Sequence, residues 1–157
     1  MKKRLFTQLS ALVLACSVLP GAALAQAPGS MAELAQYAGP DRMQRLIAGA
    51  KKEGKLNIYT SAQTEDIGAL VAGFEKKYGI KVSIWRAASE KVLQRSITEA
   101  QAKRFTVDVI ETNGPELESM HREQILQAIK SPGLKDLMPQ AIRPHGEWVG
   151  TRLNVFV

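Results

Sequence analysis

The chain has 157 residues, 45% of them apolar, with one cysteine and a net charge of +6. This length allows one ordinary domain with a hydrophobic core and not two, and a single cysteine excludes a fold held by internal disulfides. Three of the 21 basic residues lie in the first four positions, so the remainder has 18 basic against 15 acidic residues, a net charge of +3.

The N-terminus has the three parts of a secretory signal peptide. Residues 1–4 are basic, residues 5–19 form an apolar run too short to span a bilayer comfortably, and small residues at positions 23 and 25 provide a cleavage site. The sequence therefore predicts a signal peptide at 1–25 and export to the periplasm or an equivalent compartment.

An alternative processing site is a lipobox at 13–16, with lipidation of Cys16. Leu14 is bulky for its position and the apolar run would be cut short, so cleavage after Ala25 is favoured. Cleavage there also removes Cys16, which leaves a mature chain without a thiol, a disulfide or a thiolate metal site.

Beyond the signal, helical and strand patterns alternate along the chain. In order, we expect a flexible leader at 26–39 with a short helix at 31–37, a helix from Pro40 to about Glu53, a strand at 56–60, a helix from Thr64 to Tyr78, a strand at 80–85, a helix from Ser89 to about Ala100, a strand at 107–111 and a helix at 116–123. Strands each followed by a helix are typical of βαβ units. The predicted fold class is α/β, with a mainly parallel sheet as the middle of three layers.

Helix ends have their own signals. Thr64 and Ser89 are expected to cap the helices that follow them, and Gly54 and Gly79 to end the helices before them. The inward faces of the two central helices are expected to be Ile67, Leu70, Val71, Phe74 and Tyr78, and Val92, Leu93, Ile97 and Ala100.

Three dibasic pairs fall at 51–52, 76–77 and 103–104, each at the predicted end of a helix, where cations offset the helix dipole. No aromatic residues are interleaved with them. The pattern therefore favours solvated helix ends, and no nucleic-acid partner is expected.

The pattern weakens after Ile125. We expect a short strand at 126–129, a short helix at 132–138, a polar loop at 143–147 and a strand at 148–157. That last strand stops on three apolar residues without a turn or a cap, which suggests a chain cut inside an element.

Catalytic and metal motifs are absent from the sequence. It has no Gly-rich phosphate loop, no HExxH or GxSxG motif and no pair of histidines at metal-ligand spacing, so no enzyme activity, cofactor or metal is expected. His121 on a helix and His145 in a loop are interpreted as separate, structural histidines. Asp108 is expected to make a structural hydrogen bond, although Asp108 and Glu111 could also line a cleft.

Three turns follow the three predicted strands at the same edge of the sheet. Ligands of open α/β sheets bind at this edge, and helix N-termini there offer backbone N–H groups to a polar or anionic solute. The candidate solute-binding residues are Ser61, Gln63, Thr64, Ala88, Ser89, Asn113 and Gly114. The alternative, in which Thr64 and Ser89 only cap helices, stays open.

Three segments carry a family resemblance: 53–61, 74–82 and 107–110. In this order they resemble the extracellular solute-binding proteins of ABC importers, in the branch that contains periplasmic ferric-iron-binding proteins. The resemblance covers about 45–157 and includes 146–150. It implies a periplasmic component that captures a small polar or anionic solute and delivers it to the importer's membrane subunits.

The family has two α/β lobes with the ligand between them, so the resemblance implies that residues 40–157 are an N-terminal lobe truncated at a hinge strand. In iron binders of the family the first turn offers a His and the third a Glu. The matching positions here are Gln63 and Asn113, neutral amides that argue against ferric iron and favour a small organic or phosphorus-containing solute. The alternative function is a lone lobe that self-associates through its 148–157 edge without binding a solute.

Overall fold

The computed structural model describes residues 31–151. The predicted signal peptide at 1–25 and most of the predicted strand at 148–157 lie outside the described residues. Within residues 31–151, no helix is long and apolar enough to cross a membrane.

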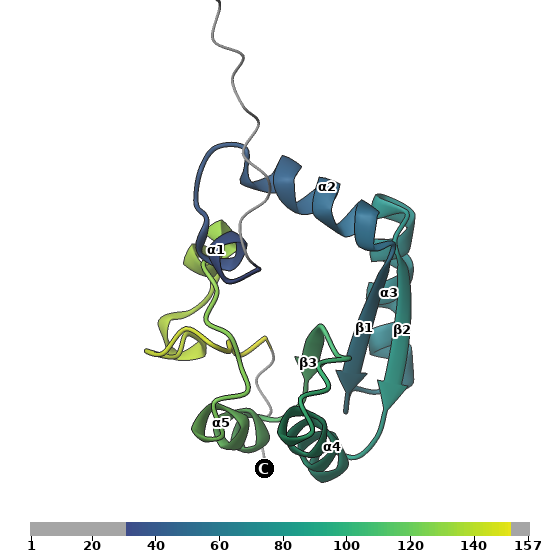
Figure 1. Cartoon of the computed structure of the whole chain (residues 1–157), viewed down its shortest axis with the longest axis vertical. Helices are drawn as coiled ribbons and strands as arrows, with labels where there is room; N and C mark the ends of the chain where they lie inside the picture. The colour runs from purple at the N-terminus through teal and green to yellow at the C-terminus, as the bar shows by residue number, and fades with distance from the viewer. Residues whose placement is uncertain (1–30, 152–157) are drawn as a thin grey trace, which may run out of the picture.

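The elements alternate as expected for an α/β fold (Figure 1). They are α1 (Met31–Gln36), α2 (Arg42–Glu53), β1 (Lys55–Thr60), α3 (Thr64–Tyr78), β2 (Lys81–Arg86), α4 (Ser89–Gln101), β3 (Val109–Glu111), α5 (Gly114–Arg122) and the 3-10 helices η1 (Pro132–Asp136) and η2 (Pro139–Ala141).

The sheet has three parallel strands in the order β2-β1-β3. Ile58 is opposite Ile84 of β2 and Val109 of β3, and the register runs on to put Thr60 opposite Arg86 and Glu111. Ile58 to Thr60 are buried in the central strand, as a strand covered on both faces requires. This confirms the predicted fold class.

Helices cover the sheet because each connection between parallel strands must cross over it. The first crossover moves from β1 to β2 and the second moves back past β1 to β3, so right-handed connections place α3 and α4 on opposite faces. In the structure α3 packs on β2, α4 packs on β1, and α5 packs on α4.

The core lies between β1, α4 and α5. Its buried members are Tyr59, Val92, Leu117 and Met120, and partly buried side chains, including Trp85 and Trp148, pack against them. The expected inward face of α3 is only partly right. Ile67 is buried and Val71, Phe74 and Tyr78 are partly buried, but Leu70 is 67% exposed.

The helix ends confirm the roles predicted for two glycines and correct those predicted for two polar residues. Gly54 and Gly79 take left-handed φ values of +74° and +69° at the ends of α2 and α3, a conformation that costs glycine little. Thr64 and Ser89 are not caps. They are the first helical residues of α3 and α4, and Gln63 and Ala88 hold the cap positions.

Two of the three dibasic pairs lie at helix ends as predicted, and the third does not. Lys51, Lys52, Lys76 and Lys77 lie in the last turns of their helices as expected. Lys103 and Arg104 lie beyond the end of α4, because that helix ends at Gln101.

Several predicted boundaries were wrong. The third strand begins at Val109 and not at 107, and α5 begins at Gly114 and not at 116. Residues 126–129 form no strand, and a 3-10 helix at Pro132–Asp136 replaces the helix expected at 132–138. Residues 148–151 are not a strand, and their β pairing is a single antiparallel bridge between Ile142 and Val149.

The helix α1, present where a short helix was expected, is held by the segment after α5. Gln36 donates a side-chain hydrogen bond to the Ala128 carbonyl at 2.6 Å, and the Lys130 N–H donates to the Ala35 carbonyl at 2.9 Å. Arg42 at the start of α2 donates to the Lys130 carbonyl at 2.7 Å. The N-terminal helices and the 128–130 segment are therefore joined by bonds between distant parts of the sequence.

Candidate functional site

The three turns after the strands meet at one edge of the sheet. Parallel strands end on the same side, and direct hydrogen bonds join the turns there. Ser61 Oγ and Thr112 Oγ1 are 3.1 Å apart, which links the first turn to the third. Arg86 Nε donates to the Ala62 carbonyl at 2.6 Å, which links the second strand's end to the first turn. The predicted edge is thus one connected structure.

Glu111 fixes the first turn from the neighbouring strand. Its carboxylate accepts a hydrogen bond from the Thr60 hydroxyl and another from the Ala62 N–H, the latter at 3.0 Å. The Ser61 N–H also donates to the Glu111 carbonyl at 3.0 Å. A hydrogen bond from a backbone N–H to a carboxylate is stronger than one to a neutral acceptor. Glu111 therefore fixes the path of the backbone at 60–62.

Asp108 makes the structural hydrogen bond that was expected of it. The Asn57 N–H donates to its carboxylate at 2.7 Å. Asp108 thus ties the chain just before β3 to β1.

The helices α3, α4 and α5 begin directly after these turns. Their cap residues are Gln63, Ala88 and Asn113, all in extended conformation and none with a side-chain hydrogen bond to its helix. The first N–H groups of a helix have no partner inside it and carry the positive end of the helix dipole. Without side-chain caps, these three N-termini can offer N–H groups to an anion or a polar ligand.

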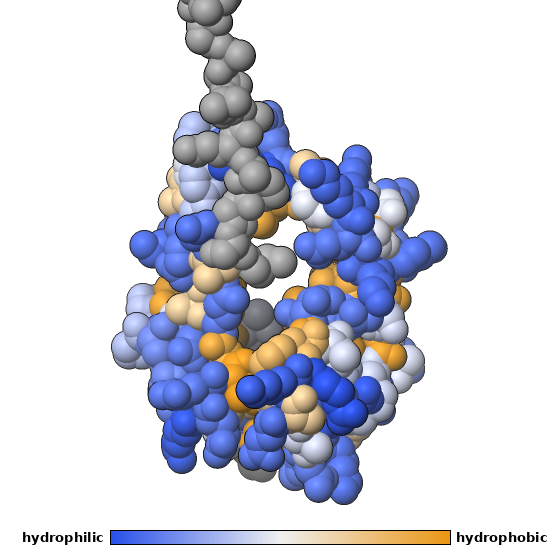
Figure 2. Space-filling view, in the orientation of Figure 1, coloured by the Kyte–Doolittle hydropathy of each residue, from blue (hydrophilic) through white to orange (hydrophobic). Residues whose placement is uncertain are grey.

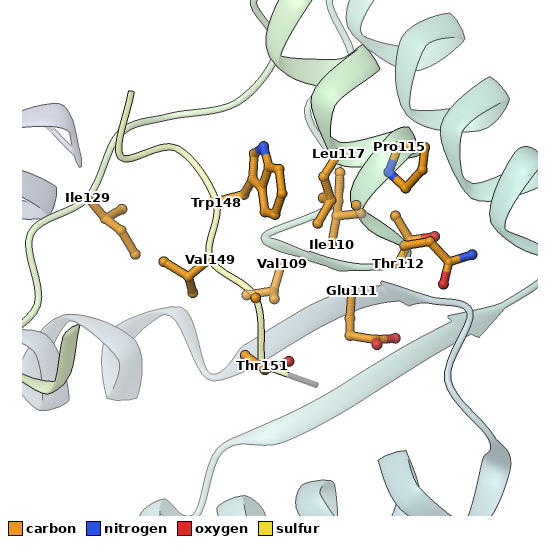
Figure 3. A pocket seen from close by; sticks show the side chains of 13 residues that line it. Val109, Ile110, Glu111, Thr112, Pro115, Leu117, Ile129, Trp148, Val149 and Thr151 are labelled. Carbon is orange, nitrogen blue, oxygen red and sulfur yellow. The ribbon is translucent and has the colours of Figure 1, made fainter. Parts of the chain in front are cut away.

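A cavity of about 790 Å³ lies beside the third turn. Its lining is Val109 to Pro115, Leu117, Ile129 and Trp148 to Thr151. Figure 3 shows Trp148 and Val149 on one side and Val109, Ile110 and Leu117 on the other, with the Glu111 carboxylate pointing toward the neighbouring strand. The walls are mainly apolar, and polar groups come from the turn at 111–113.

The space-filling view (Figure 2) shows an opening near the centre of this face, with apolar residues along parts of its wall and polar residues over the outer surface. A second cavity of about 460 Å³ is lined by residues of α1, α2 and α4 and by the segments that follow α4 and α5. Trp148 lines both cavities, so its side chain forms part of each wall.

The predicted site residues divide into two groups. Asn113 and Gly114 line the cavity beside the third turn. Ser61 is joined to that turn through Thr112. The remaining four, Gln63, Thr64, Ala88 and Ser89, lie at the N-termini of α3 and α4 and are not among the lining residues of this cavity.

Sequence reasoning missed Trp148 as a cavity wall, since an alternating apolar pattern assigned it to a strand. The structure places it against Gly114: a Cβ on this glycine would lie 3.6 Å from the Trp148 ring. A contact at this distance is an ordinary van der Waals contact, so Trp148 packs beside the start of α5.

Metal-ligand side chains gather at a different place. His121, His145 and Glu147 form a group whose ligand atoms all lie within 4.8 Å of one another. Spacing along the chain could not reveal this group, because His121 is on α5 and the other two residues are on the loop after η2.

No family model matches the chain. Solved structures do. An iron- and citrate-bound protein from Trichodesmium, named IdiA or FutA, is 27% identical with a TM-score of 0.54, over 62% of this chain and 31% of that one. Iron-bound HitA from Pseudomonas aeruginosa is 25% identical with a TM-score of 0.56, over 61% of this chain and 31% of that one.

The apo ferric ion-binding protein A from Pasteurella haemolytica shares the fold, with a TM-score of 0.53 at 23% identity, over 62% of this chain and 30% of that one. The resemblance to ferric-iron-binding proteins is thus confirmed as a similarity of part of their structure. The match spans about a third of the length of each of these proteins.

Proposed function

We propose that this chain is a solute-binding lobe of a periplasmic component of an ABC importer, and that it captures a small polar or anionic solute. The observation that carries the proposal is that three helices begin, without side-chain caps, directly after the strand ends at the carboxyl edge of one parallel sheet. Each can donate backbone N–H groups, and each helix dipole favours negative charge at its own N-terminus.

The proposal is for binding and not for catalysis. Two of the similar structures have iron bound, and the third is described as a ferric ion-binding protein. The candidate solute-binding residues at this edge offer hydroxyl, amide and backbone groups, which recognise a solute by hydrogen bonds without activating it chemically.

The ligand set favours an anion over a bare ferric ion. Gln63 and Asn113 are exposed neutral amides, whereas ferric iron prefers anionic oxygen ligands. One of the similar proteins holds citrate together with its iron. An anion such as citrate, alone or carrying a metal, therefore suits the helix N-termini of this edge better than the metal alone does.

Affinity is expected to be modest for a single lobe. A two-lobed clamp buries most of a ligand's surface by closing over it, and each lobe supplies part of the contact. If one lobe forgoes about 4 kcal/mol of contact, a micromolar complex becomes roughly millimolar.

The test compares ligands and a charge change at the site. The purified chain is titrated by calorimetry with citrate, inorganic phosphate, ferric citrate and a ferric salt. In Asn113→Asp the new carboxylate can cap α5 and repel an anion, so we expect anion binding to weaken by about tenfold or more. Gln44→Glu, the same charge change at an exposed position on α2, should leave binding unchanged.

Binding of the ferric salt without an anion, strengthened by Asn113→Asp, would contradict the proposed ligand class while keeping the edge as a site. Equal anion binding by the two variants and the parent chain would contradict the proposal that this edge of the sheet is the binding site.

A further inference from the structure

Four side chains with nitrogen or oxygen donors lie together between α5 and the loop at 143–147. His121 and Glu118 are on α5, one turn apart, and His145 and Glu147 are on the loop. Their side chains are 17% to 31% exposed. Among residues 31–151, His121, His145 and Glu147 are the one group of three ligand-type side chains close enough to share an ion.

Both imidazoles direct Nδ1 toward Glu147. His121 Nδ1 is 2.7 Å from Glu147 Oε2, and the Glu147 N–H donates to His145 Nδ1 at 3.1 Å. An imidazole nitrogen that accepts a hydrogen bond is unprotonated, so His145 Nδ1 has a lone pair that a metal can take in place of the Glu147 N–H, and the ring proton is on Nε2.

The opposite nitrogen of His145 faces Glu118. His145 Nε2 and Glu118 Oε2 are 3.8 Å apart, and both atoms are buried without a hydrogen-bond partner in the described part of the chain. This distance is too long for a hydrogen bond. A metal-bound histidine usually donates its other N–H to a carboxylate. If His145 Nε2 and Glu118 Oε2 moved about 1 Å closer together, His145 would donate to Glu118 in this way.

We propose that His121, His145 and Glu147 bind a divalent transition metal of the zinc class, with Glu118 as the carboxylate that orients His145. Two imidazoles and one carboxylate are a ligand set that suits zinc and not magnesium or calcium, which prefer oxygen. Three protein ligands leave one tetrahedral position to water.

Binding requires a small local change. The two rings are stacked at 3.9 Å with 14° between their planes, so their nitrogen lone pairs lie in nearly parallel planes. An ion about 2.0–2.1 Å from each nitrogen needs the rings to fan apart. The ion then replaces the hydrogen bond between His121 and Glu147 and the one that His145 Nδ1 accepts.

The ion would join two elements that line the solute cavity. Trp148 follows Glu147 directly, and its ring lies 6.1 Å from that of His145. A metal between α5 and this loop fixes the position of Trp148, a wall of both cavities. The metal site does not use the turn residues, so it stands or falls independently of the proposed function.

The test uses the purified chain without a polyhistidine tag, stripped of metal by a chelator. The chain has two histidines, so its imidazole NMR signals report on this site alone. Zinc titration should shift the signals of both rings together and saturate at one ion per chain. Cobalt should give the visible absorption of a tetrahedral site and lose it when zinc is added.

His145→Gln and His121→Gln should each weaken zinc binding by about 100-fold or more, since even an outer-shell partner contributes 10–100-fold. The matched control is Glu123→Gln, an exposed carboxyl beside the end of α5, which should bind as the parent chain does. If a histidine variant fails to fold, the zinc titration of the two imidazole signals in the parent chain tests the proposal by itself. No saturable shift below about 1 mM zinc, a shift of one ring only, or equal weakening by the control would overturn the proposal.

Discussion

Tyr59 and Glu99 show how single residues hold the core beneath the site. The Glu99 carboxylate accepts hydrogen bonds from the Tyr59 hydroxyl, the Thr106 hydroxyl and Arg95 Nε, each at 2.8 Å. The Arg95 guanidinium also lies 4.5 Å from the Tyr59 ring centre. Burial acts to raise the pKa of Glu99, but these hydrogen bonds outweigh burial and hold the pKa below its ordinary value.

Replacing Glu99 should therefore destabilise the fold. Tyr59 is 4% exposed. Glu99→Ala removes the charged acceptor of the hydrogen bond from the Tyr59 hydroxyl, and water cannot easily replace that acceptor. We expect a loss of about 1–3 kcal/mol in the free energy of unfolding, measured by urea denaturation. Gln94→Ala, at an exposed position on the same helix, should stay within about 0.5 kcal/mol. Equal losses in the two variants would show that the Glu99 hydrogen bonds do not hold the core.

The elements with a regular pattern were predictable from sequence. β1, β2 and α2 to α4 have strong periodicity, and Gly54 and Gly79 mark two of their ends. Predictions from local sequence pattern were wrong where tertiary contacts determine the structure. This applies to the cap roles of Thr64 and Ser89, and to the chain after Ile125, where apolar residues recur at no regular spacing. The position of the three turns at one edge followed from the βαβ pattern, because parallel strands end on the same side of a sheet. Trp148 and the histidine pair could not be foreseen, because their positions depend on the path of that last segment.

The contact between α3 and β2 predicts a pH dependence. Glu75 on α3 accepts the Val82 N–H at 2.9 Å, on a strand that has β1 as its one partner in the described sheet. The backbone hydrogen bond from Val82 lowers the pKa of Glu75 from its ordinary value of 4.5, against the effect of burial. Because the folded-state pKa is the lower one, this stabilisation is complete above the ordinary pKa and is lost as pH falls through the folded-state pKa.

Glu75→Gln should accordingly flatten the acid side of the stability curve. Unfolding is followed by circular dichroism in urea between about pH 6 and about pH 3, and the parent chain should lose more stability over this range than the variant does. The control is Glu53→Gln, an exposed carboxyl at the end of α2. A variant curve parallel to that of the parent chain would rule out Glu75 as a source of the acid sensitivity.

At the scale of the molecule, much apolar surface is left uncovered. Leu70 is 67% exposed, Phe105 77% and Met138 57%, and the sheet of the described residues has three strands. Apolar surface of this kind is common where another chain or domain packs. The predicted truncation at a hinge strand and the predicted self-association through 148–157 stay predictions, as does the signal peptide at 1–25.

The central claim is that the carboxyl edge of the sheet binds an anionic solute through helix N-termini. It is tested most directly by backbone amide NMR of the purified chain during titration with citrate and with inorganic phosphate. Hydrogen bonds to an anion should shift the first-turn N–H signals of α3 at 64–66, of α4 at 89 and 90, and of α5 at Gly114 and Glu116. Saturable shifts confined to these amides and to the cavity around Trp148 are the predicted result. Saturation with all three N-termini unchanged, or no saturable shift with either anion up to about 10 mM, tenfold above the roughly millimolar affinity expected of one lobe, would contradict the account.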